Sequence, residues 1–316
     1  MEKINEFYTY LNCQQTAQHY LFQCYQKIPG IDAVTKSYEN CNAFMYYLDH
    51  GNRFYENSGK VDLFARPVLL FYGMIHLLKA CLLTKRPSYP ESTALLAHGV
   101  SARKRKRKNY TFMKDEVKVQ HHGLFPYCAE HLFSNRQLPF EKIDMEKLFS
   151  LIPELNHLFT FQDNEQMVVV STVGSRFFQF PVQLLDSYHL TASAFKKRLA
   201  THLPEIKQLE LDDSHIQLEL TKPLDTIDGP FYVHTNKDIY FPIDREHFLP
   251  LPEVMVHYLL LYNLSMLCRY EPEWWGDLLV TKSDIDYPFI VRFLQLTANK
   301  IPLLLGMELH QQLNKK

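Results

Sequence analysis

One stretch in the first third of the chain, residues 67–83, is apolar on every side of the helix that it would form. Only Gly73, His76 and Lys79 interrupt its run of hydrophobic residues. Pro67 suits the first position of a helix, because a helix does not use the N–H that proline lacks there. A helix with so little polar surface must lie inside the protein. We therefore predict a central buried helix around which the rest of the chain packs.

This stretch is too short and too polar for a membrane span, which needs about 20 predominantly apolar residues. No cationic segment followed by an apolar one opens the chain, so no secretory signal is predicted. The 6 cysteines are scattered without a Cys-x-x-Cys pair, whereas zinc sites normally use ligand pairs about two to four residues apart. We expect a cytoplasmic protein with no membrane contact, no metal site and no cofactor. The oligomeric state stays open.

Helical periodicity occupies both ends of the chain. The apolar faces of the first and last blocks each need a partner, and the simplest arrangement is that they pack together. Besides the central helix, we predict helices over residues 6–25, 38–55, 192–202, 254–270, 274–280, 285–296 and 301–313.

The middle of the chain is typical of strands. A β-branched run covers residues 167–171, and residues 206–220 alternate apolar and polar side chains around Asp212, Asp213 and Ser214. Two further short strands flank a turn at residues 235–238 and predict a hairpin.

Together these patterns predict an α+β fold, with a mainly helical body formed by the N- and C-terminal helices and a mixed β segment in the middle. The predicted parts are an N-terminal helical part (1–90), a basic connector and helix (91–160), a β-rich segment (161–250) and a C-terminal helical part (251–316) that forms one unit with the first.

A run of six consecutive cations interrupts a chain whose formal net charge is only -1. Like charges repel, so such a run lies on a solvated loop or against an anionic partner. One interpretation is phosphate binding with Tyr110 as a base-stacking surface; the other is a solvated loop or a strand edge protected by charge. We predict that residues 98–123 bind a nucleotide, a nucleic acid or an anionic protein surface. The run comprises Arg103, Lys104, Arg105, Lys106, Arg107 and Lys108.

The central helix carries Tyr72, His76 and Lys79 at positions i, i+4 and i+7, which share one ridge of a helix. A buried lysine must find an acceptor or lose its charge. The ridge predicts either a polar pocket, in which His76 is a general base or an anion ligand, or an internal hydrogen-bond network with Lys79 reaching solvent.

Two arginines mark helix ends. Arg66 stands at the positive end of the central helix, where it needs a carboxylate or phosphate partner. Arg269 stands at a helix C-terminus, where it can bind the last carbonyl groups. Glu271 is a possible ion-pair partner for Arg66 or Lys79. The residues therefore predict either a polar pocket or a structural corner.

Histidine–glycine pairs bracket the basic run, at His98 with Gly99 and at residues 121–123. They place imidazoles near a bound phosphate, or they are turns with surface histidines. His76, His98 and His121 are the candidates for proton transfer if the protein is an enzyme acting on a nucleotide or phosphoester. A third possibility is an interaction module with exposed aromatic side chains. The sequence contains no Walker A loop and no dinucleotide fingerprint.

Several segments together resemble the YaaC-like family of bacterial proteins, in the same order and over nearly the whole chain. The resemblance implies a cytoplasmic bacterial protein and carries no activity or catalytic residue with it. The segments are residues 66–73, residues 98–101 with the cations 103–106, residues 115–118, and residues 264–267 continuing through 269–272.

Overall fold

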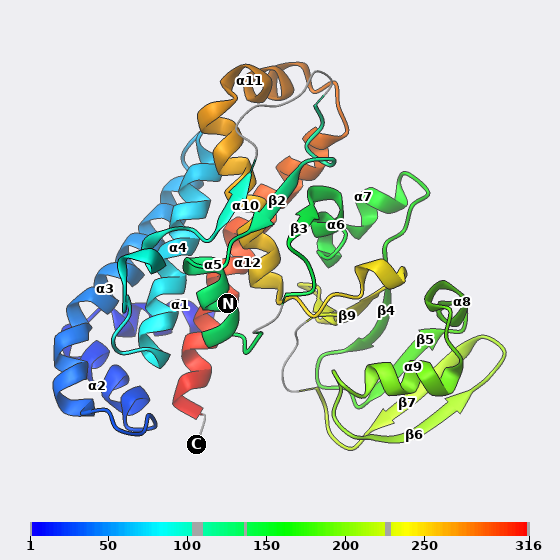
Figure 1. The fold of residues 1–316 in the computed structure, drawn as a ribbon, viewed down its shortest axis with the longest axis horizontal. Coiled ribbons are helices and arrows are strands. Elements are labelled where there is room, and N and C mark those ends of the chain that lie inside the picture. The colour runs from blue at the N-terminus through cyan, green and yellow to red at the C-terminus, as the bar shows by residue number, and fades with distance from the viewer. Residues whose placement is uncertain (1, 103–109, 136–137, 225–228, 315–316) are drawn as a thin grey trace. The chain divides into compact units, whose positions relative to one another are not determined.

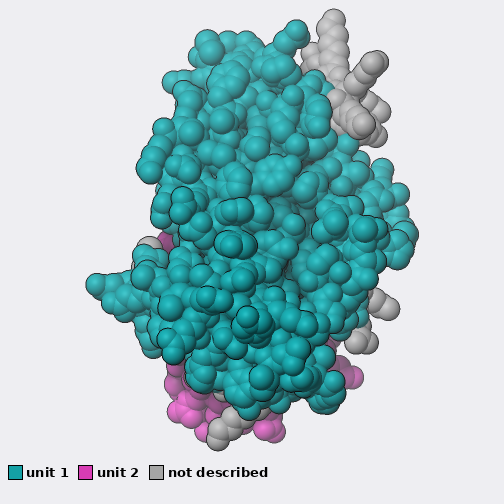
Figure 2. Space-filling model, turned by 90° about the vertical axis from the view of Figure 1, so that its left-hand side faces the viewer, with its two compact units in different colours: residues 1–144, 257–316 teal, residues 145–256 magenta. Residues whose placement is uncertain are grey.

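The computed structural model describes residues 2–102, 110–135, 138–224 and 229–314 (Figure 1). The chain divides into two compact units, coloured separately in Figure 2. Unit 1 comprises residues 1–144 and 257–316, and unit 2 comprises residues 145–256. With 55% helix and 13% strand, the chain has the predicted α+β fold, and its small sheets are antiparallel.

Unit 1 is built from helices of both ends of the chain. The Tyr8 hydroxyl donates to the Pro302 carbonyl at 2.8 Å, and the Tyr20 hydroxyl donates to the Leu309 carbonyl at 2.8 Å. These bonds join the first and last helical blocks. The helices are α1 (Glu2–Leu11), α2 (Gln14–Tyr25), α3 (Ala33–Ser58), α4 (Arg66–Lys85), α5 (Leu124–His131), α11 (Pro272–Thr281) and α12 (Asp286–Asn314), with α10 (Glu253–Tyr270) beginning in unit 2 and continuing in unit 1.

Helix α4 is the predicted central helix. Leu70, Phe71, Leu77 and Leu78 are among its completely buried side chains. Among the described helices, α4 alone has the length and apolar composition of a membrane span, and 72% of that stretch is buried inside the protein. This burial is typical of a core helix.

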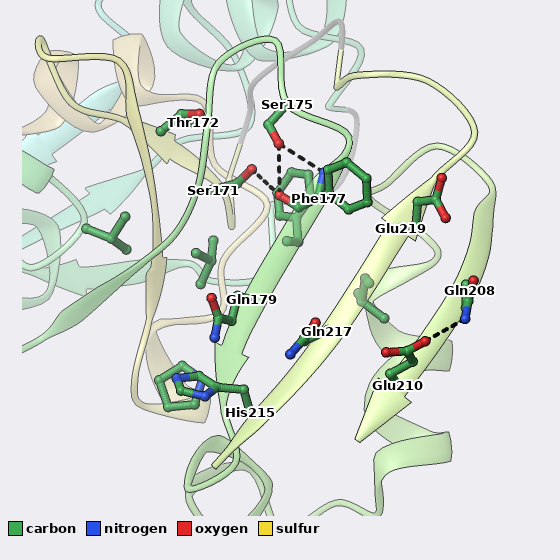
Figure 3. A pocket seen from close by; sticks show the side chains of 15 residues that line it. Ser171, Thr172, Ser175, Phe177, Gln179, Gln208, Glu210, His215, Gln217 and Glu219 are labelled. Carbon is green, nitrogen blue, oxygen red and sulfur yellow. Dashed lines mark hydrogen bonds between the residues drawn. The ribbon is translucent and has the colours of Figure 1, made fainter. Parts of the chain in front are cut away.

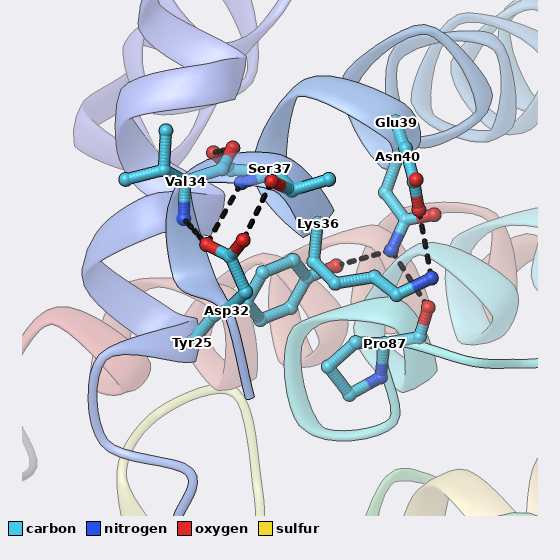
Figure 4. Close-up of polar contacts among 9 residues, drawn as sticks. Tyr25, Asp32, Val34, Lys36, Ser37, Glu39, Asn40 and Pro87 are labelled. Atoms are coloured by element: carbon cyan, nitrogen blue, oxygen red, sulfur yellow. Dashed lines mark hydrogen bonds and ion pairs between the residues drawn. The ribbon is translucent and has the colours of Figure 1, made fainter. Parts of the chain in front are cut away.

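Helix α3 begins at Ala33, five residues before the predicted start at Tyr38, because Asp32 caps it. The Asp32 carboxylate accepts hydrogen bonds from the Val34 and Thr35 N–H groups (Figure 4). An aspartate at this position satisfies N–H groups that the first turn leaves unbonded.

Asn40 on α3 joins three parts of unit 1. Its side-chain amide donates to the Tyr25 hydroxyl at 2.9 Å and to the Pro87 carbonyl at 2.8 Å (Figure 4). The end of α2, the first turns of α3 and the segment after α4 are thereby held together.

Two predictions were wrong about where a helix is interrupted. Residues 6–25 form two helices, because Cys13 adopts an extended conformation between α1 and α2. The break leaves Phe7 and Tyr20 edge to face at 5.8 Å. Both helices bury an apolar face. The helical spacing of apolar residues therefore continues through Cys13, and the sequence pattern does not show the break.

The opposite error concerns the C-terminus, where the two predicted helices, 285–296 and 301–313, form the single helix α12. Pro302 lies inside it and removes one backbone hydrogen bond. Phe293, Ile301 and Leu305 on either side of the proline are completely buried, so packing maintains the helix.

Unit 1 also contains a small antiparallel sheet in the order β1-β2-β3. The strands lie partly in the segment predicted as a connector, and a strand of three residues is too short to show an alternating pattern. The basic run follows β1, but residues 103–109 lie outside the described residues. The elements are η1 (Thr93–Leu96), β1 (Val100–Ala102), β2 (Glu116–Val119) and β3 (Lys142–Asp144).

Unit 2 has two antiparallel sheets, in the orders β4-β9-β8 and β5-β7-β6. The hairpin predicted around residues 235–238 is confirmed as β8–β9. The alternating pattern of residues 206–220 belongs to two paired strands, β6 and β7, with residues 212–214 between them. One aromatic core, including Phe178, Phe180 and Phe241, receives side chains from both sheets.

Short helices complete unit 2. Its elements are α6 (Met145–Phe149), η2 (Pro153–Leu155), α7 (Asn156–Thr160), β4 (Met167–Thr172), β5 (Phe177–Pro181), α8 (Leu184–Tyr188), α9 (Ala192–Leu199), β6 (Ile206–Leu211), β7 (His215–Leu220), β8 (Tyr232–Val233), β9 (Asp238–Pro242) and η3 (Arg245–His247).

Candidate functional site

The predicted ridge of α4 lies against α3. Two glycines allow this close approach: a Cβ atom on Gly73 would lie 2.9 Å from the Tyr55 ring, and one on Gly51 would lie 2.7 Å from Leu77. Figure 1 shows α3 and α4 side by side. This close approach brings side chains of α3 onto the ridge of α4.

The result is a continuous row of aromatic, histidine and cationic side chains on unit 1, which we call the histidine row. Tyr72, His76 and Lys79 are half-buried within it, as their spacing predicts. Other members come from α3, from the segment before β1 and from α10. The row comprises Tyr47, His50, Phe54, Tyr72, His76, Lys79, His98, Tyr262 and Arg269.

His76 is at the centre of the α3–α4 contact. Its ring centroid lies 5.4 Å from that of His50 and 5.7 Å from that of Phe54, against which it stacks. Its Nδ1 atom is buried and has no hydrogen-bond partner among the described residues. Burial, and then the charges of Lys79 and His50, lower the pKa of His76 to about 4. The imidazole is therefore neutral at pH 7.

Lys79 lies one turn further along the ridge. Its Nζ atom lies 5.6 Å from the centroid of the Tyr47 ring, a cation–π contact. Burial lowers the pKa of Lys79. No carboxylate in the described part of the chain forms an ion pair with it.

His98 joins the row from the segment that precedes β1. Its ring lies 5.0 Å from Phe71 and 5.8 Å from Tyr262, centroid to centroid. The His98 carbonyl accepts hydrogen bonds from the Phe125 N–H at 3.0 Å and the Tyr258 hydroxyl at 2.8 Å, which fix the backbone. Burial lowers the pKa of His98, and the charges of Arg269 and Lys79 lower it further.

Arg269 is at the C-terminal end of α10, as predicted. Its Nε atom donates to the Ser265 carbonyl at 2.8 Å, and its guanidinium carbon lies 5.2 Å from the centroid of the Tyr270 ring. The residue is exposed. None of the ion pairs of the described residues includes it.

The other residues of the predicted polar pocket lie elsewhere. Arg66 donates to the Ser58 carbonyl at 3.0 Å and the Val61 carbonyl at 3.2 Å, so it joins the end of α3 to the start of α4. The charge of Glu271 contributes to raising the pKa of Tyr110. Of the five predicted pocket residues, Tyr72, Lys79 and Arg269 belong to the histidine row.

The basic run, Arg103 to Lys108, lies outside the described residues. The segment that follows it is held by side-chain contacts. Tyr110 is half-buried: its hydroxyl donates to Asp115 Oδ2 at 2.8 Å, and its ring meets Trp274 edge to face at 4.9 Å. Burial and the nearby Asp115 raise the pKa of Tyr110. The Tyr110 ring, predicted as a stacking surface, is thus in contact with a residue of α11.

A second carboxylate holds the same segment. Asp286, completely buried at the start of α12, accepts hydrogen bonds from the Phe112 and Met113 N–H groups. The Asp115 carboxylate also accepts from the Asn263 amide at 2.9 Å. Residues 110–115 are therefore fixed to α10 and α12.

The two histidine–glycine pairs meet in space. Gly99 (φ +76°) and Gly123 (φ +122°) are in direct contact, since a Cβ atom on Gly123 would lie 2.4 Å from the Gly99 Cα. The Gln120 N–H donates to the Gly99 carbonyl at 2.9 Å. His98 enters the histidine row, whereas His121 is exposed on the turn. The two pairs thus form turns, with His121 as a surface histidine. A role of either histidine beside a bound phosphate stays a prediction.

Sequence reasoning missed the contribution of α3. Tyr47, His50 and Phe54 occupy positions i, i+3 and i+7 of one helix, a spacing that places them on one face. That spacing was a usable signal. Only the packing of α3 against α4 shows that this face meets the ridge.

The fold and the histidine row define an α+β protein of two units, with a cationic, histidine-containing surface on the helical unit. No group of three or more histidine, cysteine, aspartate or glutamate side chains able to hold a metal ion occurs within the described ranges. A family model described as YaaC-like Protein matches residues 9–309, so the chain belongs to the YaaC-like family. No curated protein and no solved structure matches the chain.

Proposed function

We propose that this chain is a cytoplasmic bacterial protein that binds a phosphate-bearing partner on unit 1, through residues 98–123 and the adjacent histidine row. The observation that carries the proposal is that two cations on different helices, Lys79 and Arg269, belong to the histidine row and have no described carboxylate partner. The charges of Lys79 of α4 and Arg269 of α10 both lower the pKa of His98.

Phosphate fits this surface on electrostatic grounds. An anion beside Lys79 would offset the desolvation of its ammonium group, and it would give both Lys79 and Arg269 an opposite charge. Arginine and lysine are the side chains that bind phosphate oxygens most strongly. The cations at 103–108 begin five residues after His98 in the sequence and would extend the same positive surface along a nucleotide or nucleic acid.

The test is direct binding of nucleotides, RNA and DNA to the full chain over a salt titration. We expect binding whose logarithm falls linearly with the logarithm of the salt concentration. A variant with alanine at Arg103, Arg105 and Arg107 should lose at least about tenfold in affinity and have a smaller slope.

The matched control carries three alanines at exposed cations elsewhere, Lys60, Lys197 and Arg245, and has the same net charge as the test variant. It should bind like the wild type. Equal losses in the two variants would mean that only total charge matters, and no binding by the wild type to any of these probes would refute the proposal.

One observation favours a catalytic alternative on the same site. His76 is neutral at pH 7 and has a buried Nδ1 atom without a described partner, so this nitrogen is free to accept a proton, as a general base must. If the protein hydrolyses a phosphoester, His76→Gln should abolish turnover while salt-dependent binding persists. Turnover that survives this substitution would exclude His76 as the base.

A further inference from the structure

Unit 2 contains a cavity of about 500 Å³, and no residue of the histidine row or of the segment 98–123 lines it. Figure 3 shows it, with Ser171 and Thr172 of β4 at one side and Gln179, Gln217 and Glu210 on the neighbouring strands of the other sheet. The cavity therefore lies where β4 and β5, which follow each other in the chain, separate into different sheets.

The hydrogen bonds of β5 show which of its backbone groups face the cavity. The Leu220 N–H donates to the Arg176 carbonyl, and the Val182 N–H donates to the Ser214 carbonyl. In an antiparallel ladder, alternate residues bond to the neighbouring strand and the residues between them point the other way. Residues 176 and 182 bond to β7, so the residues one position out of step with them, including Gln179, point their N–H and C=O groups away from β7.

The same argument applies to β4. The Ile243 N–H donates to the Gln166 carbonyl at 2.9 Å, which sets the phase of the β4–β9 ladder. Val169 opposes Tyr240 in this ladder, and its N–H and C=O groups point away from β9. Val169 and Gln179 both line the cavity.

Side chains bond other backbone groups on these two edges, at Phe177 of β5 and at Met167 of β4. At the turn, the Phe177 carbonyl accepts from the Ser171 hydroxyl at 2.6 Å and from the Ser175 hydroxyl at 3.2 Å. At the far end, the Asn156 amide donates to the Met167 carbonyl at 2.9 Å and accepts from the Met167 N–H at 3.0 Å. No ladder joins β4 to β5 among the described strands, so the edge groups of Val169 and Gln179 face the cavity.

We propose that this cavity binds an extended polypeptide segment carrying lysine or arginine, which adds as a strand to the edge of β5. An extended backbone presents donors and acceptors at the spacing of a strand edge, and this mode of peptide recognition gives affinity through main-chain hydrogen bonds. The partner's alternate side chains would lie over Gln179 and Gln217, whose amides both donate and accept.

Charge selects the kind of segment. Glu210 and Glu219 line the cavity, and its lining residues include no lysine or arginine. Glu219 accepts from Lys207 at 2.9 Å, and Glu210 accepts from the Gln208 amide at 2.6 Å. Of these two carboxylates, Glu210 is the one that forms no ion pair within the described part of the chain. This site is on unit 2 and favours cations, so it is independent of the anion site proposed on unit 1.

The probe is the blocked pentapeptide Ac-Val-Lys-Val-Lys-Val-NH2, added to the full chain and followed by hydrogen–deuterium exchange and by a binding isotherm. We expect slower exchange over residues 168–181. A version with N-methylated backbone amides, and a version with glutamate in place of lysine, should each bind at least about tenfold more weakly.

Substitution at one residue tests the edge itself. Gln179→Pro removes only the N–H that faces the cavity and no bond to β7, and β5 already has a proline in the same phase at Pro181. This variant should lose peptide binding, whereas Gln179→Ala, which keeps the backbone N–H, should retain it within about threefold.

The proposal is wrong if wild-type protein shows no slowed exchange with about 1 mM lysine peptide, or if the N-methylated peptide binds equally well. Equal binding of the glutamate peptide would overturn the preference for cations. The peptide comparisons use wild-type protein, so they decide the matter even if Gln179→Pro lowers the unfolding temperature.

Discussion

At the contact between Gly99 and Gly123, the absence of two side chains determines how the segments around the basic run meet. Both residues have positive φ angles, and each would place a Cβ atom against the backbone of the other segment. Gly30 also has a positive φ of +79°, but a Cβ atom there would have nothing within 4 Å. A side chain at Gly30 would therefore cost only backbone strain, whereas a side chain at Gly99 or Gly123 would cost both strain and a steric clash.

We predict that Gly123→Ala lowers the free energy of unfolding by at least about 3 kcal/mol, because conformational strain adds to overpacking. Gly30→Ala should cost only about 1–2 kcal/mol, the strain term alone. Urea denaturation of both variants measures the difference. Equal losses would mean that the Gly99–Gly123 contact relaxes without cost.

His76 couples the stability of the α3–α4 contact to pH. Its pKa of about 4 in the folded protein lies below the ordinary value of 6.5, so the folded state binds fewer protons between these values. Acidification through this range therefore favours the unfolded state. Stability that is fully present above pH 6.5 is lost as the pH falls toward 4.

We predict that His76→Phe removes this part of the pH dependence, because phenylalanine keeps an aromatic ring and takes up no proton. Since the side chain is only half-buried, solvent screening reduces the expected effect to about 1–2 kcal/mol between pH 7 and pH 4. Denaturation midpoints of wild type and variant across this range measure it. Parallel curves would show that His76 is not the titrating group.

At the scale of elements, the start of α12 determines where the segment after the basic run lies. Asp286 is completely buried and accepts from two consecutive backbone N–H groups, those of Phe112 and Met113. Leaving buried donors without an acceptor costs about 1–3 kcal/mol each. A single carboxylate thus joins segments that are far apart in the sequence.

We predict that Asp286→Ala lowers the free energy of unfolding by about 2–5 kcal/mol. Asp277→Ala, which removes an exposed carboxylate on α11, is the control and should change it by less than about 0.5 kcal/mol. Chemical denaturation compares the two. A small effect at position 286 would show that water or another group replaces the carboxylate.

At the scale of the whole molecule, the net charge of -1 gives no overall attraction for an anion. Any anion binding must therefore come from local cations, such as Lys79 and Arg269 of the histidine row or the basic run in the sequence. This arrangement has a consequence for pH, because both cations lower the pKa of His98. A bound anion would offset them and raise that pKa, so binding would be accompanied by proton uptake.

We predict that affinity for the phosphate-bearing probe increases about two- to fivefold as the pH falls from 8 to 6, and that His98→Asn removes most of this increase. Binding isotherms at constant ionic strength measure both. A pH-independent affinity in the wild type would separate His98 from the binding site.

The sequence by itself determined the parts of this protein that depend on local pattern. The burial of α4 follows from a helix with almost no polar surface, and the shared ridge of Tyr72, His76 and Lys79 follows from the 3.6-residue period. The hairpins of unit 2 follow from turn residues between alternating strands. Each of these features needs information from only a few neighbouring residues.

The tertiary structure alone decided which remote groups meet. It placed the α3 face with Tyr47 and His50 against α4, directed Arg66 to carbonyl groups at the end of α3, and continued α12 through Pro302. The cavity between β4 and β5 is a similar case. The backbone groups that face it are set by the pairing of β5 with β7 and of β4 with β9, strands that are distant in the sequence. A local sequence pattern does not show which residues of a strand bond to such a neighbour.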